Sequence, residues 1–290
     1  MRILVLGAYG MLGHKLFLEL RREHDVFGTC RNLIRDAPLI HHFPENAMIE
    51  GVLANELDTV EKAISISDPE VIINCIGIVK QLREAKDPLV SIRVNSLFPH
   101  ELSRICTRSD RRLIHFSTDC VFSGHVGNYS ENDIPDPIDL YGRSKLLGEI
   151  DDEMNLTIRT SIIGPELQGN RGLLEWFVSK RGGQVSGFTK SIFSGLTTLE
   201  MSRAVGMIVE KFKDITGVWH LSAEPISKYD LLNLINERLD LEITLEPDSK
   251  VKIDRSLDSS QFRENTGYSP PNWPDMIDNM IIDYRNEKNW

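Results

Sequence analysis

Cysteine is scarce in this chain of 290 residues, which contains only four. Cys30, Cys75, Cys106 and Cys120 lie far apart, form no CxxC pair and have no cluster of histidines beside them. This spacing argues against a disulfide framework and against a zinc site. We therefore expect free thiols, no bound metal and a reducing, cytoplasmic location.

Basic residues are in the minority, with 33 Lys and Arg against 43 Asp and Glu and a formal net charge of -10. A nucleic-acid-binding face needs clustered Lys and Arg to neutralise phosphates. We therefore expect no nucleic-acid partner. A local basic pocket for a small phosphorylated ligand is still compatible with this balance.

Long apolar stretches are also missing. The longest of them, such as residues 71–79, are far too short to cross a bilayer. The chain runs from its first residues directly into a strand-like segment, so we expect neither a secretory signal nor membrane association. Repeats, low-complexity tracts and long flexible linkers are absent from the sequence.

What the first half does contain is an alternation of short apolar runs with segments of helical period. The runs cover residues 3–6, 25–29, 71–76 and 113–117. Uninterrupted apolar runs are typical of strands buried on both faces, as in a parallel sheet covered by helices. The alternation predicts an α/β protein with a Rossmann-type doubly wound parallel sheet.

Apolar residues also recur at helical spacing between the first two runs, with Lys15, Glu19 and Arg21 on the other side. The second half is less regular. Helices are predicted there at 173–178, 198–212 and 228–239, and short strands at 217–221 and 242–245. We expect a dinucleotide-binding domain at 1–160 and a smaller C-terminal α/β substrate-binding region at 161–290, with their segments partly interleaved.

A glycine pattern, Gly7, Gly10 and Gly13, connects the first predicted strand to the first helix. Gly7 permits a tight turn, Gly10 lets the backbone approach a pyrophosphate, and Gly13 lets the helix pack closely on the strand. The placement between strand and helix predicts a dinucleotide site. The alternative is a βα turn without a ligand.

The end of the second predicted strand indicates which dinucleotide is bound. A carboxylate there would bond the ribose 2′-hydroxyl of NAD, whereas an arginine would accept the 2′-phosphate of NADP. Arg31 follows this strand, with no carboxylate close behind it. The expected cofactor is NADP(H), with NAD(H) left open, because a lone loop arginine can also be a solvated surface residue.

Tyr141 and Lys145 stand four residues apart, which places both side chains on one face of a helix. An ammonium group beside a phenol favours the phenolate, so we expect Lys145 to lower the pKa of Tyr141 and make it an acid–base group. Ser117, Thr118 and Asp119 end the strand before this helix. Thr118 would hydrogen-bond a substrate carbonyl there, although these residue types also suit caps and turns.

These motifs resemble the extended short-chain dehydrogenases/reductases, and most closely the dTDP-4-dehydrorhamnose reductases, over nearly the whole chain. The resemblance rests on the glycine turn, the Ser-Thr-Asp-Cys-Val-Phe run from 117 and Tyr-Gly-Arg-Ser-Lys-Leu-Leu-Gly-Glu from 141. It implies hydride transfer from NADPH to C4 of a 4-keto-6-deoxy hexose on a nucleoside diphosphate. Such work serves the building of surface polysaccharide or another glycosylated product, and it allows a homodimer.

The same resemblance implies roles for individual residues. Tyr141 would donate the proton, Lys145 would hold the ribose and tune Tyr141, and Thr118 would orient the carbonyl. Together with the glycine turn, the cofactor contacts would be Gly7, Tyr9, Gly10, Met11, Leu12, Arg31, Asn74, Cys75, Gly77, Asn95, Ser117, Lys145 and Arg159. The substrate contacts would be Thr118, Asp119, Tyr141, Trp176 and Phe188, the last two being packing residues in the alternative interpretation.

The sequence departs from the family pattern at Cys120, where the family commonly has tyrosine, and after the third strand, where Leu53 and Ala54 replace an acidic residue. These departures leave the particular sugar open. Two other functions also remain. One is an epimerase or dehydrogenase acting on a nucleotide sugar. The other is a non-catalytic NADP-binding subunit like the regulatory beta subunit of methionine adenosyltransferase, which is similar to these reductases.

Overall fold

The computed structural model describes residues 1–34, 40–80 and 83–288. Its centre is a seven-stranded sheet of order β10-β6-β5-β4-β1-β2-β3, in which every neighbouring pair is parallel. The strands are β1 (Arg2–Leu6), β2 (Asp25–Thr29), β3 (Met48–Ile49), β4 (Val71–Asn74), β5 (Arg112–Phe116), β6 (Leu156–Arg159) and β10 (Gly217–His220). The predicted Rossmann-type parallel sheet is confirmed.

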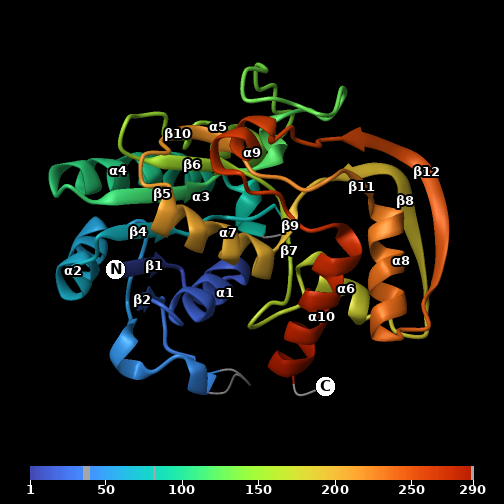
Figure 1. Cartoon of the computed structure of the whole chain (residues 1–290), viewed down its shortest axis with the longest axis horizontal. Coiled ribbons are helices and arrows are strands. Elements are labelled where there is room, and N and C mark those ends of the chain that lie inside the picture. Colours follow the sequence, from blue (N-terminus) through green and yellow to red (C-terminus); the bar gives the residue numbers. More distant parts are fainter. Residues whose placement is uncertain (35–39, 81–82, 289–290) are drawn as a thin grey trace.

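Helices cover both faces of this sheet (Figure 1). Side chains of alternate strand residues belong to two different cores: Ile3 and Val5 pack with the helices of one face, and Leu4 and Leu6 with those of the other. The first face carries α1 (Met11–Leu20) and α7 (Thr198–Lys211), and the second carries α2 (Leu57–Ser67) and α4 (Phe98–Arg108). Burial on both faces explains why the strands read as uninterrupted apolar runs.

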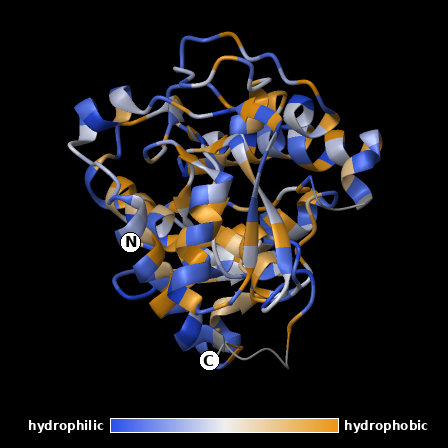
Figure 2. Ribbon diagram, turned by 90° about the vertical axis from the view of Figure 1, so that its right-hand side faces the viewer, coloured by the Kyte–Doolittle hydropathy of each residue, from blue (hydrophilic) through white to orange (hydrophobic). Residues whose placement is uncertain are grey.

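A smaller sheet of order β11-β8-β12 forms the second part of the molecule. Its strands are β8 (Gln184–Phe193), β11 (Ile226–Ser227) and β12 (Thr244–Asp254). A separate apolar core joins them to α6 (Leu173–Val178), α8 (Lys228–Leu239) and α10 (Trp273–Lys288). In Figure 2 the helices alternate between hydrophobic and hydrophilic residues, as expected of helices with one buried side.

Two elements from the second half belong to the first part. Strand β10 pairs with β6 at one edge of the large sheet, and α7 packs against α1. A short ribbon of β7 (Ile162–Ile163) and β9 (Leu196–Thr197) precedes α7, and α9 (Ser260–Thr266) lies next to β10 (Figure 1). A domain boundary at residue 160 stays a prediction.

Lys15 lies on the side of α1 away from the apolar residues, as its spacing predicts, but it is only 2% exposed. Helix α10 covers this side of α1. The Lys15 ammonium pairs with the carboxylate of Glu287 and lies 2.6 Å from Asp283 Oδ2. A lysine that the helical pattern assigns to the polar side therefore forms a buried ionic contact between the first and last helices.

All helices within the described residues are too short or too polar to span a bilayer. The four cysteines are free thiols. In the part of the chain that the structure describes, no group of three or more His, Cys, Asp and Glu side chains is arranged to hold a metal ion.

Candidate active site

The turn after β1 has the backbone that its glycines predict. Gly7 adopts φ +77°, a left-handed conformation that disfavours other residues. A Cβ on Gly13 would lie 2.1 Å from the Gly7 carbonyl oxygen, so only glycine allows α1 to start this close to the turn. Gly10 is the N-cap and offers no side-chain cap. The first N–H groups of α1 therefore remain without side-chain partners, an arrangement that favours a bound phosphate.

The other turn residues differ in what they can offer a ligand. The Tyr9 ring packs edge-on against Phe43, with 5.3 Å between the ring centroids. Leu12 is buried in the core, and Met11 abuts Gly172, since a Cβ there would lie 2.4 Å from Met11 Cε. Cofactor contacts from these three residues stay predictions, and the buried Leu12 is placed to contribute its backbone.

Arg31 lies exposed just beyond β2, and the structure brings a carboxylate near it that the sequence analysis missed. Glu50 directly follows β3, and its Oε1 accepts a hydrogen bond of 2.9 Å from the backbone N–H of Leu33. Because β3 is parallel to β2, residues that follow the two strands meet at one edge. This pairing of short strands is the signal that would have revealed Glu50.

The segment after β4 is held by two amides. Asn74 Oδ1 accepts from the Ile76 N–H at 3.1 Å, which turns the chain and ends β4 two residues earlier than predicted. Asn95 accepts from the Ile78 N–H at 2.8 Å and donates to the Ile78 carbonyl at 3.1 Å and to Ser144 Oγ at 3.1 Å. The Asn95 amide thus joins this loop to the helix that carries Tyr141.

Asn95 itself lies on a π-helical turn, Ile92–Leu97, a rare form that is frequent at functional sites. Gly77 faces it, because a Cβ on Gly77 would lie 3.5 Å from Asn95 Oδ1. Cys75 lies between the glycine turn and Lys145. Its carbonyl carbon would lie 3.4 Å from a Cβ on Gly7, and its thiol is within electrostatic range of Lys145. The four predicted cofactor contacts in this region, Asn74, Cys75, Gly77 and Asn95, thus lie close together beyond the carboxyl end of β4, and their contact with a cofactor stays a prediction.

Helix α5 (Leu140–Leu146) presents Tyr141 and Lys145 at the carboxyl end of β5. Asp139 caps the helix by accepting from the Gly142 N–H at 2.8 Å, and Lys80 Nζ lies 2.6 Å from Asp139 Oδ2. Lys145 Nζ donates to the carbonyl oxygen of Phe116, the last residue of β5, at 2.5 Å. The lysine side chain therefore ties α5 to the end of the strand.

The environment of this pair affects the two pKa values differently. Burial lowers the pKa of Lys145 to about 8, and the charge of Glu149 opposes this shift. Burial raises the pKa of Tyr141; the charge of Cys120 acts in the same direction, whereas a hydrogen bond with Thr118 opposes it. The expectation of a lowered Tyr141 pKa is therefore wrong. The pKa is raised, because desolvation of the phenolate outweighs the effect of neighbouring charges and hydrogen bonds.

Thr118, Asp119 and Cys120 form the wall opposite Tyr141. Thr118 Oγ1 accepts from the Cys120 N–H at 3.1 Å and donates to Asp119 Oδ1 at 3.2 Å. Burial raises the pKa of Asp119, although a hydrogen bond from Cys120 and the charge of Arg255 oppose the rise. Arg255 also donates from Nε to the Phe122 carbonyl oxygen at 2.8 Å.

A buried ionic network lies behind this wall. Glu149 Oε1 accepts from Ser117 Oγ at 2.6 Å and from Arg159 Nε at 2.8 Å, while its Oε2 accepts from Arg159 Nη2 at 2.8 Å. The side chains of Glu149 and Arg159 are each 7% exposed. The guanidinium of Arg159 and the hydroxyl of Ser117 are thus engaged within the protein, and their predicted cofactor contacts stay predictions.

His220, at the end of β10, completes this network. Arg159 Nη1 lies 3.3 Å from His220 Nε2, and His220 Nδ1 lies 3.0 Å from the Tyr129 carbonyl oxygen. Burial and the charge of Arg159 lower the pKa of His220 to about 4. The ring is therefore neutral near pH 7. It donates from Nδ1 and accepts from Arg159 at Nε2.

Trp176 and Phe188 lie in the second part of the molecule. Trp176 is 37% exposed on α6, with its ring 6.3 Å from that of Phe177. Phe188 lies in β8 in register with Asp248 of β12. Their contribution to a sugar pocket stays a prediction.

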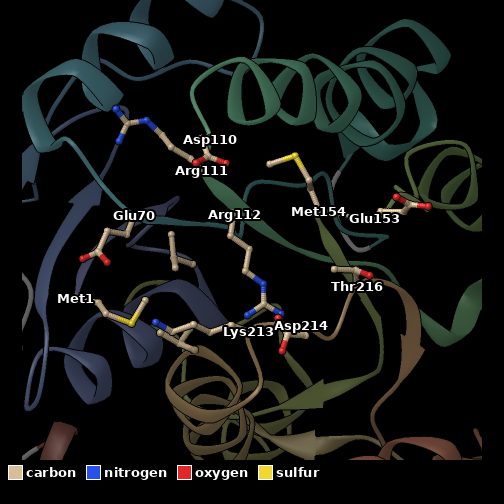
Figure 3. A pocket seen from close by; sticks show the side chains of 12 residues that line it. Met1, Glu70, Asp110, Arg111, Arg112, Glu153, Met154, Lys213, Asp214 and Thr216 are labelled. Atoms are coloured by element: carbon tan, nitrogen blue, oxygen red, sulfur yellow. The ribbon is translucent and has the colours of Figure 1, made fainter.

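Figure 3 shows a surface pocket of about 690 Å³ with the side chains that line it. Its lining includes Met1 and Arg112, which stand at the amino ends of β1 and β5. Tyr141 lies at the other end of the sheet, beyond the carboxyl end of β5. Ligands of doubly wound sheets bind at the carboxyl ends of the strands. The chemistry of this chain is therefore assigned to the carboxyl edge, where the glycine turn, Thr118, Tyr141 and Lys145 meet, and not to this pocket.

A doubly wound parallel sheet with a glycine turn after its first strand and a Tyr–Lys helix at its carboxyl edge defines the short-chain dehydrogenase/reductase class. The chain belongs to the RmlD substrate binding domain family, whose family model matches residues 1–286. The resemblance noted in the sequence is thereby confirmed.

Three curated relatives are similar to part of the chain. A probable low-salt glycan biosynthesis reductase, Agl14, of Haloferax volcanii is 33% identical over 50% of this chain and 46% of its own length. A dTDP-4-dehydrorhamnose reductase of Mycobacterium tuberculosis is 30% identical over 51% of this chain and 44% of its own length. The methionine adenosyltransferase 2 subunit beta of Danio rerio is 30% identical over 51% of this chain and 42% of its own length. The matches span less than half the length of these relatives.

Solved structures match almost the whole chain. A hypothetical dTDP-4-dehydrorhamnose reductase from Sulfolobus tokodaii is 28% identical, with a TM-score of 0.77, and the match covers 94% of this chain and 98% of that one. A dTDP-4-dehydrorhamnose reductase from Bacillus anthracis in complex with NADP is 20% identical, with a TM-score of 0.80. The match covers 97% of this chain and 99% of that one. At that identity the second likeness shows the fold alone.

Proposed function

We propose that this chain is an NADPH-dependent reductase of the C4 keto group of a nucleotide-linked 4-keto-6-deoxy sugar. The observation that carries the proposal is the meeting of three side chains at the carboxyl end of β5: Tyr141 lies beside Thr118, and Lys145 is anchored on the Phe116 carbonyl oxygen. The family membership and the relatives named as reductases support it.

The residues present fit a dinucleotide. A left-handed Gly7, an uncapped Gly10 and a close-packed Gly13 leave room for a pyrophosphate at the start of α1. When bound, NADPH supplies the hydride. Arg31 would hold a 2′-phosphate and Lys145 the ribose, while Thr118 would orient the substrate carbonyl beside Tyr141.

The environment of Tyr141 determines its protonation state before the reaction. Burial keeps its pKa above the ordinary value, so the phenol retains its proton near pH 7 until a carbonyl oxygen begins to accept negative charge. Tyr141 would give its proton to the carbonyl oxygen to form the new O–H bond, matching the hydride that a bound NADPH would deliver to C4. Tyr141 would be left as the phenolate and would regain a proton from solvent before the next turnover.

The direct test is oxidation of NADPH, followed by its absorbance, against a panel of 4-keto-6-deoxy nucleotide sugars. NADH is run in parallel, and a panel member already reduced at C4 serves as the blank. We expect turnover on at least one keto sugar, with NADPH preferred. Tight NADPH binding without turnover on any panel member would contradict the proposal.

Replacement of Tyr141 by phenylalanine removes the proton donor alone. We expect kcat to fall by about 10²- to 10⁴-fold, with the dissociation constant of NADPH nearly unchanged. Stopped-flow turnover and fluorescence titration of NADPH measure the two quantities. A variant that keeps most of its kcat would remove Tyr141 from the assigned role.

The similarity to a methionine adenosyltransferase beta subunit favours a second candidate, a dinucleotide-binding regulatory subunit. Under that function the chain would bind NADP(H), reduce no nucleotide sugar and associate with a catalytic partner. The turnover assay separates the two candidates. An epimerase or dehydrogenase acting on a nucleotide sugar would instead retain its dinucleotide or reduce it during turnover. A homodimer and a cytoplasmic location stay predictions.

A further inference from the structure

Glu149 occupies the junction of the three elements that build the site. It follows α5, and its carboxylate receives Ser117 from the end of β5 and Arg159 from the end of β6. Both oxygens of the carboxylate accept hydrogen bonds, and the geometry with Arg159 is bidentate. Few single side chains could fix these two strand ends to the catalytic helix.

The position of Ser117 connects Glu149 to the reacting groups. Ser117 stands between Phe116, whose carbonyl accepts from Lys145, and Thr118, which lies beside Tyr141. A displacement of Ser117 would therefore move the anchor of Lys145 and the neighbour of Tyr141 together. The backbone around Glu149 is equally confined, because a Cβ on Gly148 would lie 1.9 Å from the Asn95 carbonyl oxygen.

The charge of Glu149 is also held in place. Arg159 cannot turn away, since its remaining nitrogen Nη1 contacts His220 and its guanidinium carbon lies 5.4 Å from the centre of the Phe122 ring. The His220 ring is fixed in turn by the Tyr129 carbonyl, and the backbone N–H of His220 donates to Glu131 Oε1 at 2.8 Å. The carboxylate is thus a buried anion held from several sides, on the segment that follows α5 and four residues beyond Lys145.

Resting on the proposed function, we propose that Glu149 is a positioning residue of the reduction: its buried carboxylate sets the geometry of Thr118, Tyr141 and Lys145 through Ser117, and presents a negative charge to Lys145. It touches neither substrate nor cofactor in this role. The charged and titratable groups that face Lys145 are Glu149, Cys75 from the end of β4 and His115 from β5.

The test compares two variants with a matched control. Glu149→Gln keeps the shape and removes the charge, whereas Glu149→Asp keeps the charge and shortens the reach. Glu200→Gln is the control, because Glu200 is likewise buried and likewise bonded to one hydroxyl, Tyr268, and one arginine, Arg203, but lies on α7 across the sheet.

We expect Glu149→Gln to lower kcat by about 100-fold, with little change in the KM for NADPH, since misplaced reacting groups cost rate more than binding. Loss of the anion also removes the interaction that raises the Lys145 pKa, so the titration midpoint of Lys145 should fall. Competitive acetylation of wild type and variants over a range of pH, mapped by mass spectrometry, measures that midpoint without turnover. Glu200→Gln should leave both quantities at the wild-type values.

Glu149→Asp should keep the Lys145 midpoint and still lose kcat. An unchanged midpoint and unchanged kcat in Glu149→Gln would overturn the inference. If Glu149→Gln does not fold, wild-type kcat in Glu149→Asp has the same meaning. Wild-type protein that turns over no nucleotide sugar would refute the proposed function alone, because the acetylation midpoint still reports whether Glu149 holds the charge of Lys145.

Discussion

The preference between the two dinucleotides depends on two side chains at the end of the second strand. Arg31 is exposed and free to meet a 2′-phosphate, whereas Glu50, bonded to the Leu33 N–H, places a negative charge near the same edge. The arginine favours NADPH and the carboxylate opposes a phosphate. The preference for NADPH therefore requires that the attraction of Arg31 outweigh the repulsion of Glu50, and substitution of Arg31 measures its share.

Arg31→Ala should weaken NADPH binding by about 10- to 100-fold, the equivalent of one charge-assisted hydrogen bond of about 1.5–3 kcal/mol. NADH lacks the 2′-phosphate, so its dissociation constant should change by less than about 2-fold. Isothermal titration with both dinucleotides measures the difference. Arg22→Ala, an exposed arginine at the far end of α1, is the control. Equal weakening of both dinucleotides would contradict the NADP assignment.

The pH dependence of the reaction follows from Lys145. Burial lowers its pKa to about 8, so the ammonium is present at pH 7 and is lost as the pH rises through about 8. If the cation holds the ribose, kcat/KM should fall about tenfold per pH unit above that value. The pKa of Tyr141 is raised, so loss of its proton does not lower kcat/KM at any pH below the pKa of Lys145. A profile that stays flat up to the ordinary lysine pKa of 10.5 would show that this charge is not needed.

At the level of elements, the contact between α1 and α10 depends on a buried lysine. Lys15→Met would leave Asp283 and Glu287 buried without their cation, and burial already raises the pKa of Asp283. We expect the free energy of unfolding to fall by about 3–5 kcal/mol. Denaturant unfolding followed by circular dichroism measures this change, with the exposed Lys211→Met as control. A loss no larger than that of the control would show that the ionic contact contributes little.

The elements that the sequence predicted are those whose residues repeat a regular pattern. Strand β2 and helices α6 and α8 begin and end where predicted. Strand β8 was not predicted, and β12 was recognised only at its start. Most residues of β12 are exposed, it contains Pro247, and its register with β8 shifts between Asp248 and Lys252. A polar, irregular edge strand of this kind carries no alternation to detect.

The same reasoning separates the site residues that were predicted from those that were missed. Tyr141, Lys145 and the glycine turn are local patterns whose spacing reports their geometry. Glu50 and His220 act through partners distant in sequence, Leu33 and Arg159. Only the order of the strands brings these pairs together. The raised pKa of Tyr141 could not be predicted either, because it depends on burial that the motif does not encode.

For the whole molecule, the fold class follows from the sequence, whereas the path of the chain does not. The buried runs indicate a parallel sheet covered on both faces. They do not indicate that the chain leaves this sheet after β6 (Leu156–Arg159), builds β8 and α7, and returns with β10. The two parts are thus linked by more than one passage of the chain.

The late return of the chain with β10 leaves one edge of the large sheet unpaired while the protein is being synthesised. Synthesis proceeds from the N-terminus, so β6 leaves the ribosome with one edge unpaired until Gly217–His220 follow. His220 arrives with that strand, and until then Arg159 and Glu149 lack the cover that buries their ion pair. The nascent chain therefore presents an open strand edge, prone to pairing with other chains, throughout the translation of β8 and α7. Chaperone binding would protect the protein most in that interval, whereas a translational pause there would prolong the exposure of the edge.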